Sequence, residues 1–258
     1  MTTPKHEPIA FWTIRSLSSY SNEEFLRDLT CASEQRRRRI SSIGAKGSAL
    51  PSPAQKASLL AYMMLWDLLR ATHGIDTAPL FEYPSNGFAV SRNETSGDPL
   101  GQDKTARQAQ KRFRTGKSTT AKPQLKDHPD IHFSLSHTKN AALAVVSNVP
   151  VGADIQASHN PKPALAKRVL NQTERQAIEK LEGRKQALAF AEIWARKEAF
   201  LKLQETGIKS LETLKNLKVP SDHLTEEGHS TEEGFAWCIC AKPETRALLP
   251  LSTPLNVL

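Results

Sequence analysis

Segments suited to strands and segments suited to helices both occur in the sequence, so we expect a fold that contains sheets as well as helices. Three apolar segments with strand character follow one another at residues 131–137, 141–146 and 151–156. Two long segments with helical spacing, 52–74 and 184–205, lie on either side of them. A chain of 258 residues is long enough for one large domain or two modest ones, each with its own core.

The first long helix is expected to begin at a capping box. In the letters SPAQ, Ser52 suits the N-cap, Pro53 the first helical position and Gln55 the position near N3. The apolar run LLAYMMLWDLLR follows, and the helix should end near His73 and Gly74. Because this helix is apolar on nearly every side, we expect it to be buried on more than one face.

The segment IHFSLSH is expected to form a strand whose apolar residues face inward. Its polar residues His132, Ser134 and Ser136 would then share the opposite face. The apolar run 141–146 follows, and we expect it to pair with the strand at 151–155.

The letters VGADIQ place polar residues on one face of the next strand. Val151, Ala153 and Ile155 share one side, and Asp154 and Gln156 share the other. Most such strands expose a polar face to water, so this pattern alone does not establish a site.

The chain after this strand is predicted to be mainly helical. TERQAIEKLEG should be a helix with Thr173 at the N-cap, Gln176 completing a capping box and Gly183 as the C-terminal stop. A longer helix is expected over 184–205, and GFAWCICAK (234–242) suits a strand.

Residues 91–121 have almost no apolar periodicity and are rich in basic side chains. We expect a mobile insertion there, with a short basic helix near 104–114. The net charge of +8 and the isoelectric point near 9.4 favour an anionic partner, such as nucleic acid, a phosphate-rich cofactor or an acidic protein. A nucleic-acid contact through 104–117 is one alternative, although that stretch has a single aromatic residue.

The cysteines and the N-terminus indicate a cytoplasmic protein. Cys31, Cys238 and Cys240 suit neither a disulfide framework nor a metal site, which favours a reducing compartment. The start of the chain lacks the apolar core of a signal peptide, and the longest apolar stretch is too short to span a bilayer.

The helix at 184–205 carries a carboxylate within its apolar stripe, which runs through Ala187, Phe190, Trp194, Glu198 and Leu201. Burying Glu198 costs several kcal/mol unless a cation or hydrogen-bond donors meet it. Lys202, one turn further on, is a candidate partner, and so is a metal ion. The alternative is an ordinary surface pair of Glu198 and Lys202 on a rotated helix.

Asp154, Gln156 and Glu198 together supply oxygen ligands from a strand and a helix. Mg²⁺ is typically bound by one or two carboxylates, with water and substrate phosphate oxygens completing its shell. Lysines on adjacent helical turns would neutralise a polyphosphate. The sequence therefore predicts a magnesium site that acts on a phosphoryl group.

The order FSLSH, VGADIQ and WARKEAFLK, at these spacings, resembles the 4'-phosphopantetheinyl transferase superfamily, in its monomeric, two-half type that activates peptide and polyketide synthases. The residues that match its pattern are Gly152, Asp154, Trp194, Lys197, Glu198, Ala199 and Lys202. The resemblance covers residues 122–207 well and the first 120 residues loosely. It implies an α+β fold of two α/β halves related by a pseudo-twofold axis, each a small antiparallel sheet with packed helices, with a boundary near Pro150.

The resemblance implies transfer of the phosphopantetheine arm of coenzyme A to a serine of an acidic apo carrier protein. Asp154 and Glu198 would hold Mg²⁺ against the pyrophosphate, and Glu198 would also help to deprotonate the serine. Lys202 would steady the pyrophosphate and its leaving group. These roles agree with the chemistry above, since phosphoryl transfer depends on positioning and charge neutralisation.

The family also implies residues that bind coenzyme A. Ser136 and His137 match its Ser-His pair, and Lys122 falls where it has Gly-Lys-Pro, although Ala121 replaces the glycine. Lys117 is the competing candidate if the insertion shifts the register.

The resemblance also implies a basic pair that binds a phosphate and a third residue that binds the metal. Arg36 and Arg39, three residues apart, match a basic pair for the 3'-phosphate of coenzyme A, but a solvated basic run is an equal alternative. At Gln156 the family usually has glutamate as a third metal ligand. Because an amide adds no charge, we expect weaker Mg²⁺ binding, and a non-catalytic relative is a further alternative.

Overall fold

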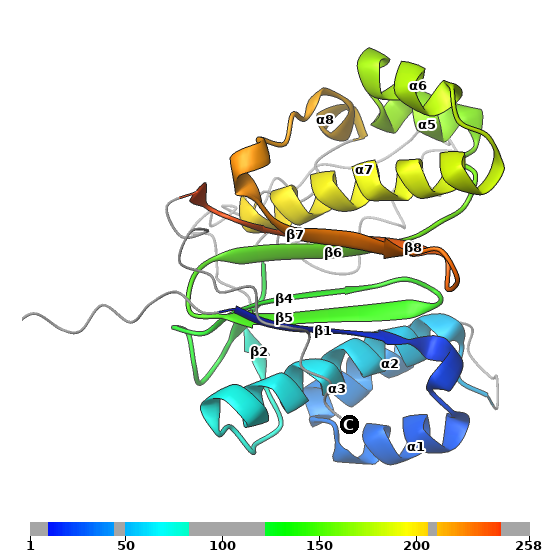
Figure 1. The fold of residues 1–258 in the computed structure, drawn as a ribbon. Helices are drawn as coiled ribbons and strands as arrows, with labels where there is room; N and C mark the ends of the chain where they lie inside the picture. The colour runs from blue at the N-terminus through cyan, green and yellow to red at the C-terminus, as the bar shows by residue number, and fades with distance from the viewer. Residues whose placement is uncertain (1–9, 44–49, 83–121, 206–210, 244–258) are drawn as a thin grey trace, which may run out of the picture.

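The computed structural model describes residues 10–43, 50–82, 122–205 and 211–243. Two three-stranded antiparallel sheets face each other, and each is covered on its outer side by one long helix with shorter helices beside it (Figure 1). The α+β class is therefore confirmed. The expected insertion at 91–121, its basic helix at 104–114 and Lys117 lie outside the described residues.

The first sheet has the order β1 (Ala10–Ser16), β5 (Ala141–Ser147) and β4 (His132–His137). The second has the order β6 (Val151–Ala157), β8 (Phe235–Ala241) and β7 (Leu224–Ser230). β4 and β6 are thus outer strands of different sheets. β2 (Phe81–Glu82) and β3 (Gln124–Leu125) form a separate, short two-stranded sheet.

The predicted pairing of 141–146 with 151–155 is wrong. β5 is bonded to β1 on one edge and to β4 on the other, so neither edge is left for β6. The connection through Asn148, Val149 and Pro150 carries the chain into the second sheet, where β6 pairs with β8. The two strands are instead packed face to face, as apolar faces of stacked sheets are. The alternation of apolar and polar residues along a strand predicts which side chains share a face, but it does not predict which strands pair.

The layer between the two sheets is apolar. Leu143 and Val145 from β5 meet Ala153 and Ile155 from β6 in one buried cluster. The indoles of Trp12 and Trp237 extend this layer, with ring centroids 4.8 Å apart. The odd-numbered residues of β6 therefore face the first sheet, and the even-numbered residues face the helix that covers the second sheet.

The first sheet is covered by α3 (Pro53–His73), which has the expected cap and burial. The Gln55 N–H donates to Ser52 Oγ (3.2 Å), and the Ser52 N–H donates to Gln55 Oε1 (2.8 Å). Gly74 ends the helix in the left-handed conformation, with φ 66°. The 3-10 turn η1 (Leu17–Ser19) and helices α1 (Asn22–Cys31) and α2 (Glu34–Ser41) come before α3 in the chain, and α1 and α2 pack against it.

The second sheet is covered by α7 (Gly183–Leu203). The shorter elements beside it are α5 (Pro163–Val169), α6 (Gln172–Glu179), α8 (Leu211–Asn216) and the 3-10 turn η2 (Ser221–His223). Among the described residues, no helix has both the length and the apolar character needed to span a bilayer. Cys31, Cys238 and Cys240 are all free thiols.

The predicted start and stop of α6 are wrong. Its N-cap is Asn171, whose Oδ1 accepts from the Glu174 N–H (2.9 Å), while Glu174 Oε2 accepts from the Asn171 N–H (2.8 Å). Thr173 and Gln176 lie inside the helix. The capping box of Asn171 and Glu174 forms, and not that of Thr173 and Gln176, because the Glu174 carboxylate also complements the helix dipole and binds a buried lysine, described below. Gly183, with φ 55°, is the first residue of α7 and not the end of α6.

The approach of α7 to β6 depends on Gly152. A Cβ atom added there would lie 2.1 Å from the Ala199 carbonyl oxygen and 2.4 Å from the Leu203 nitrogen. Only a residue without a side chain allows the helix backbone to come so close. Asp154 is two residues further along the same face of β6, so this contact also brings α7 up to Asp154.

We therefore expect Gly152→Ala to lower the free energy of unfolding by about 1–3 kcal/mol, measured by urea denaturation. The matched control is Gly228→Ala in β7 of the same sheet, where the added Cβ would lie 2.9 Å from the Trp237 ring. A side chain can shift more easily than helix backbone, so the control should lose less. Equal losses would contradict a backbone contact at Gly152.

Candidate functional site

The candidate site lies at the seam between the outer strands β4 and β6. The Ala153 N–H donates to Ser134 Oγ (2.9 Å), and the Ser134 hydroxyl donates to the Ala153 carbonyl (3.3 Å). The Ile155 N–H donates to Ser136 Oγ in the same way (3.2 Å). Two serine side chains thus take the place of a paired strand, satisfying polar groups of β6 that would otherwise be buried without partners.

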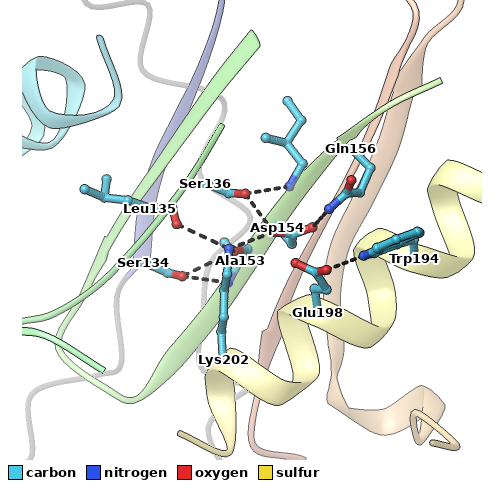
Figure 2. A network of polar contacts seen from close by, with 10 residues as sticks. Ser134, Leu135, Ser136, Ala153, Asp154, Gln156, Trp194, Glu198 and Lys202 are labelled. Atoms are coloured by element: carbon cyan, nitrogen blue, oxygen red, sulfur yellow. Dashed lines mark hydrogen bonds and ion pairs between the residues drawn. The ribbon is translucent and has the colours of Figure 1, made fainter. Parts of the chain in front are cut away.

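Asp154 is the buried centre of the seam, with 1% of its surface exposed. Its Oδ1 accepts from the Ser136 hydroxyl (2.7 Å) and from Lys202 Nζ (2.6 Å), and its Oδ2 accepts from Gln156 Nε2 (2.7 Å) (Figure 2). A carboxylate this deeply buried stays charged only with such partners.

Glu198 approaches Asp154 from α7. Figure 2 shows the two carboxylates beside each other, with the Trp194 Nε1–H donating to Glu198 Oε1. Burial and, secondly, the Asp154 charge raise the pKa of Glu198 to about 7, although the Trp194 hydrogen bond and Lys202 oppose this. The site therefore contains one carboxylate, Asp154, that accepts from three side chains, and a second, Glu198, whose pKa is raised.

Lys202 does not form the ion pair with Glu198 that its spacing suggested. Its Nζ donates to Asp154, to the Ala153 carbonyl (2.9 Å) and to the Leu135 carbonyl (3.3 Å). The reason is the position of α7 over the seam, which offers Lys202 acceptors from both strands. An ammonium group has three N–H donors, and these three contacts engage all of them.

The oxygen atoms at this seam suit a hard divalent cation. Asp154 and Glu198 face each other, and the Gln156 amide, on the same face of β6 as Asp154, has an oxygen in addition to the nitrogen bound to Asp154. Among the described residues, no cluster of three or more His, Cys, Asp or Glu side chains forms a metal site. Two carboxylates with water and substrate oxygens are, however, the ligand set that Mg²⁺ commonly has. Burial and, secondly, the Asp154 charge raise the pKa of Glu198, and a cation between the two carboxylates would offset both effects.

A cavity of about 310 Å³ adjoins the seam and has a basic wall. Basic residues from three parts of the chain line it: Arg36, Arg39, Lys122, His137 and Lys202. Its apolar wall includes Phe81 and Phe133, whose rings are stacked with centroids 5.1 Å apart. The cavity combines charges for phosphate groups with a flat apolar surface.

The expected basic pair on α2 reaches this cavity. Arg36 is buried and donates from Nη2 to Ser58 Oγ (2.9 Å), while Arg39 is exposed. Lys122 is partly buried and donates to the Val151 carbonyl. Burial lowers the pKa of Lys122 to about 8, with Lys202 adding to the fall and the Glu205 carboxylate opposing it.

Ser136 and His137 have different surroundings at the site. His137 lines the cavity, as expected for a phosphate contact. Ser136 does not line it: its hydroxyl is engaged by Asp154 and by the backbone of Ile155. We therefore assign Ser136 to the positioning of Asp154 rather than to phosphate binding.

Some residues of the site were missed by sequence reasoning. Ser134 could have been found, since it shares the strand face of Ser136. Phe81, Ser58 and Glu205 have no local signal, because only the folded chain brings them to the cavity. Lys197, a motif residue without an expected role, is buried and donates to Glu174 Oε2 (2.6 Å) and to the Val169 carbonyl (3.0 Å). These contacts of Lys197 connect α5 and α6 to α7.

Comparisons with known proteins agree with the motifs. Residues 150–250 match the family model of the 4'-phosphopantetheinyl transferase superfamily. The 4'-phosphopantetheinyl transferase psf-1 of Bacillus pumilus is 32% identical over 110 residues, which are 43% of this chain and 45% of that protein. The enzyme Sfp of Bacillus subtilis is 30% identical over 87 residues, 34% of this chain and 39% of its own. A putative 4'-phosphopantetheinyl transferase of Synechocystis is 32% identical over 130 residues, which are 47% of this chain and 51% of that protein.

The matched region spans about half the length of these curated relatives, or less. The region that the family model matches, residues 150–250, includes β6 and α7 and therefore Asp154, Glu198 and Lys202. The resemblance to the superfamily, inferred from the motifs, is confirmed.

The two seam serines allow a matched test. Ser134→Ala and Ser136→Ala each remove one hydroxyl bonded to the β6 backbone, and each should lower the free energy of unfolding by about 1–2 kcal/mol in urea denaturation. Ser136 alone also orients Asp154, so only Ser136→Ala should weaken Mg²⁺ binding, by about tenfold in calorimetric titration. Equal Mg²⁺ affinity in the two variants would contradict the positioning role of Ser136.

Proposed function

We propose that the protein transfers the 4'-phosphopantetheine arm of coenzyme A to a serine of an apo acyl or peptidyl carrier protein, releasing 3',5'-ADP. The observation that carries this proposal is the convergence of Asp154 and Glu198, from β6 and α7, beside a cavity lined by five basic residues. Carboxylates for a divalent cation next to charges for phosphates are what transfer at a pyrophosphate requires.

Asp154 and Glu198 would hold Mg²⁺, and Gln156 would contribute its amide oxygen directly or through water. When bound, the cation neutralises charge on the pyrophosphate and on its leaving group. Coenzyme A would place its phosphates against four basic residues of the cavity wall: Arg36, Arg39, Lys122 and His137.

Glu198 is suited to act as the general base. It would take the proton of the carrier serine hydroxyl, directly or through water. The serine oxygen then bonds to the phosphorus that carries the pantetheine, and the P–O bond to the other phosphate breaks. 3',5'-ADP leaves with the bonding electron pair. Lys202 lies where it adds positive charge, but it must release one of its present acceptors to donate to a phosphate oxygen.

We further propose that the chain has two halves, 1–150 and 151–258, and acts as a monomer in the cytoplasm on an acidic carrier. The arrangement of strands supports the boundary, since β1, β4 and β5 precede Pro150 and β6, β7 and β8 follow it. The net charge of +8 supports an acidic partner, because opposite charges steer such encounters.

The transfer is tested by mass spectrometry of several apo carriers after incubation with the protein, coenzyme A and Mg²⁺. We expect a mass gain of one phosphopantetheine group. Asp154→Asn and Glu198→Gln should each lower the rate by about 10²-fold or more. Glu192→Gln is the matched control, because Glu192 lies on α7 but pairs with the exposed His229 (2.8 Å).

Failure of every carrier to gain mass would contradict the proposal and favour a non-catalytic relative. Salt-sensitive retention of DNA or RNA, without transfer, would instead favour the nucleic-acid alternative.

The metal role of Gln156 has a separate test. Gln156→Glu adds a charged oxygen ligand, so the Mg²⁺ concentration for half-maximal activity should fall by about three- to tenfold. The same change removes the Nε2–H that donates to Asp154 Oδ2, so the variant without Mg²⁺ should have a lower melting temperature, restored by the ion. Gln156→Ala should raise the requirement. An unchanged or higher requirement in Gln156→Glu would contradict the assigned role.

A further inference from the structure

The basic cavity contains a carboxylate that the proposed reaction does not use. Among the described residues, Glu205 is the one acidic side chain that lines the cavity, together with basic residues that include Lys122 and Lys202. It also lines a small neighbouring pocket together with Lys122 and His132. A carboxylate in a pocket for phosphates weakens the attraction of anions, so its presence needs a reason.

The backbone of Glu205 is held in an unfavourable conformation. α7 ends at Leu203, and Glu205 follows with φ 54°, the only positive φ of a non-glycine residue in the described part of the chain. Its N–H donates to the Lys202 carbonyl (3.3 Å), which closes the last turn. Glycine commonly occupies this position after a helix, because a side chain is disfavoured there. Strained residues of this kind cluster at binding sites, where the side chain has a role.

The charge of Glu205 acts on the basic residues of the cavity. Its carboxylate raises the pKa of Lys122 and of His132, in both cases against the effect of burial. Glu205 thus offsets part of the positive charge that Lys122 presents to a ligand. It is also exposed, so its oxygens can accept hydrogen bonds from a ligand.

We propose that Glu205 is a specificity-determining residue, which disfavours ligands that bring only anionic groups and admits those that also bring an N–H or O–H donor. An inorganic polyphosphate meets repulsion from the carboxylate with nothing to compensate it. A nucleotide-like ligand with amine and hydroxyl groups can donate to the same oxygens. The inference rests on the proposed function only in the choice of coenzyme A as that second ligand.

The test compares inorganic pyrophosphate with coenzyme A by calorimetric titration without Mg²⁺ at low ionic strength. Glu205→Gln should bind pyrophosphate about three- to tenfold more tightly, while its affinity for coenzyme A rises less or falls. The gain for pyrophosphate should shrink at about 0.5 M salt, because exposed charges are then screened. Glu179→Gln, which removes an exposed charge from α6 outside the cavity, should leave both affinities unchanged.

Glu205→Gly separates charge from backbone strain. It removes both the carboxylate and the disfavoured conformation, so it should reproduce the tighter pyrophosphate binding and also raise the melting temperature, which Glu205→Gln should not. Tighter pyrophosphate binding in Glu205→Gly alone would overturn the proposal. So would unchanged pyrophosphate affinity in Glu205→Gln, or an equal gain for both ligands.

These outcomes are independent of the transfer assay. If wild-type protein modifies a carrier but Glu205→Gln shows no change in selectivity, the specificity role fails and the proposed function stands. If no carrier is modified but the selectivity changes as expected, the specificity role stands and the transferase proposal fails.

Discussion

The site depends on the burial of the Asp154 carboxylate at the seam between two sheets. Its two oxygens accept from three side chains, Ser136, Gln156 and Lys202. An isolated charge in this position would cost several kcal/mol, so these contacts are a condition for the fold and not an addition to it. They also fix the direction of the carboxylate toward α7.

The same contacts leave the site with a distribution of charge that suits a divalent cation. Asp154 pairs with the cationic Lys202, while Glu198 accepts from the Trp194 indole N–H, and burial together with the Asp154 charge raises the pKa of Glu198 to about 7. Asp154 is the carboxylate that a bound divalent cation and Lys202 would share, so we expect the contacts of Lys202 to differ between the metal-free and the metal-bound protein.

The features that the sequence predicted correctly are local ones. The capping box at Ser52 and the alternation of Ser134 and Ser136 along β4 depend on neighbours a few residues away. The motif spacing indicated that Asp154 and Glu198 belong to one site, although the strand pairing behind that site was not predicted. The partner of β6 is β8, more than 70 residues further on, and no periodicity specifies such a choice. The N-cap of α6 was ambiguous for a related reason: two overlapping boxes fit the pattern, and a distant lysine favours the one at Asn171.

The spacing of the two motifs has a physical explanation in the contact between β6 and α7. Gly152, Asp154 and Gln156 are on one face of the strand, so the glycine that lets the helix approach and the carboxylate that it approaches are one strand repeat apart. On α7, Ala199 makes the close contact with Gly152, and the residue before it, Glu198, is carried to the level of Asp154. A larger residue at 152 would move the helix outward and separate the carboxylates. The glycine therefore sets the distance on which a shared cation depends, although it touches neither the metal nor the substrate.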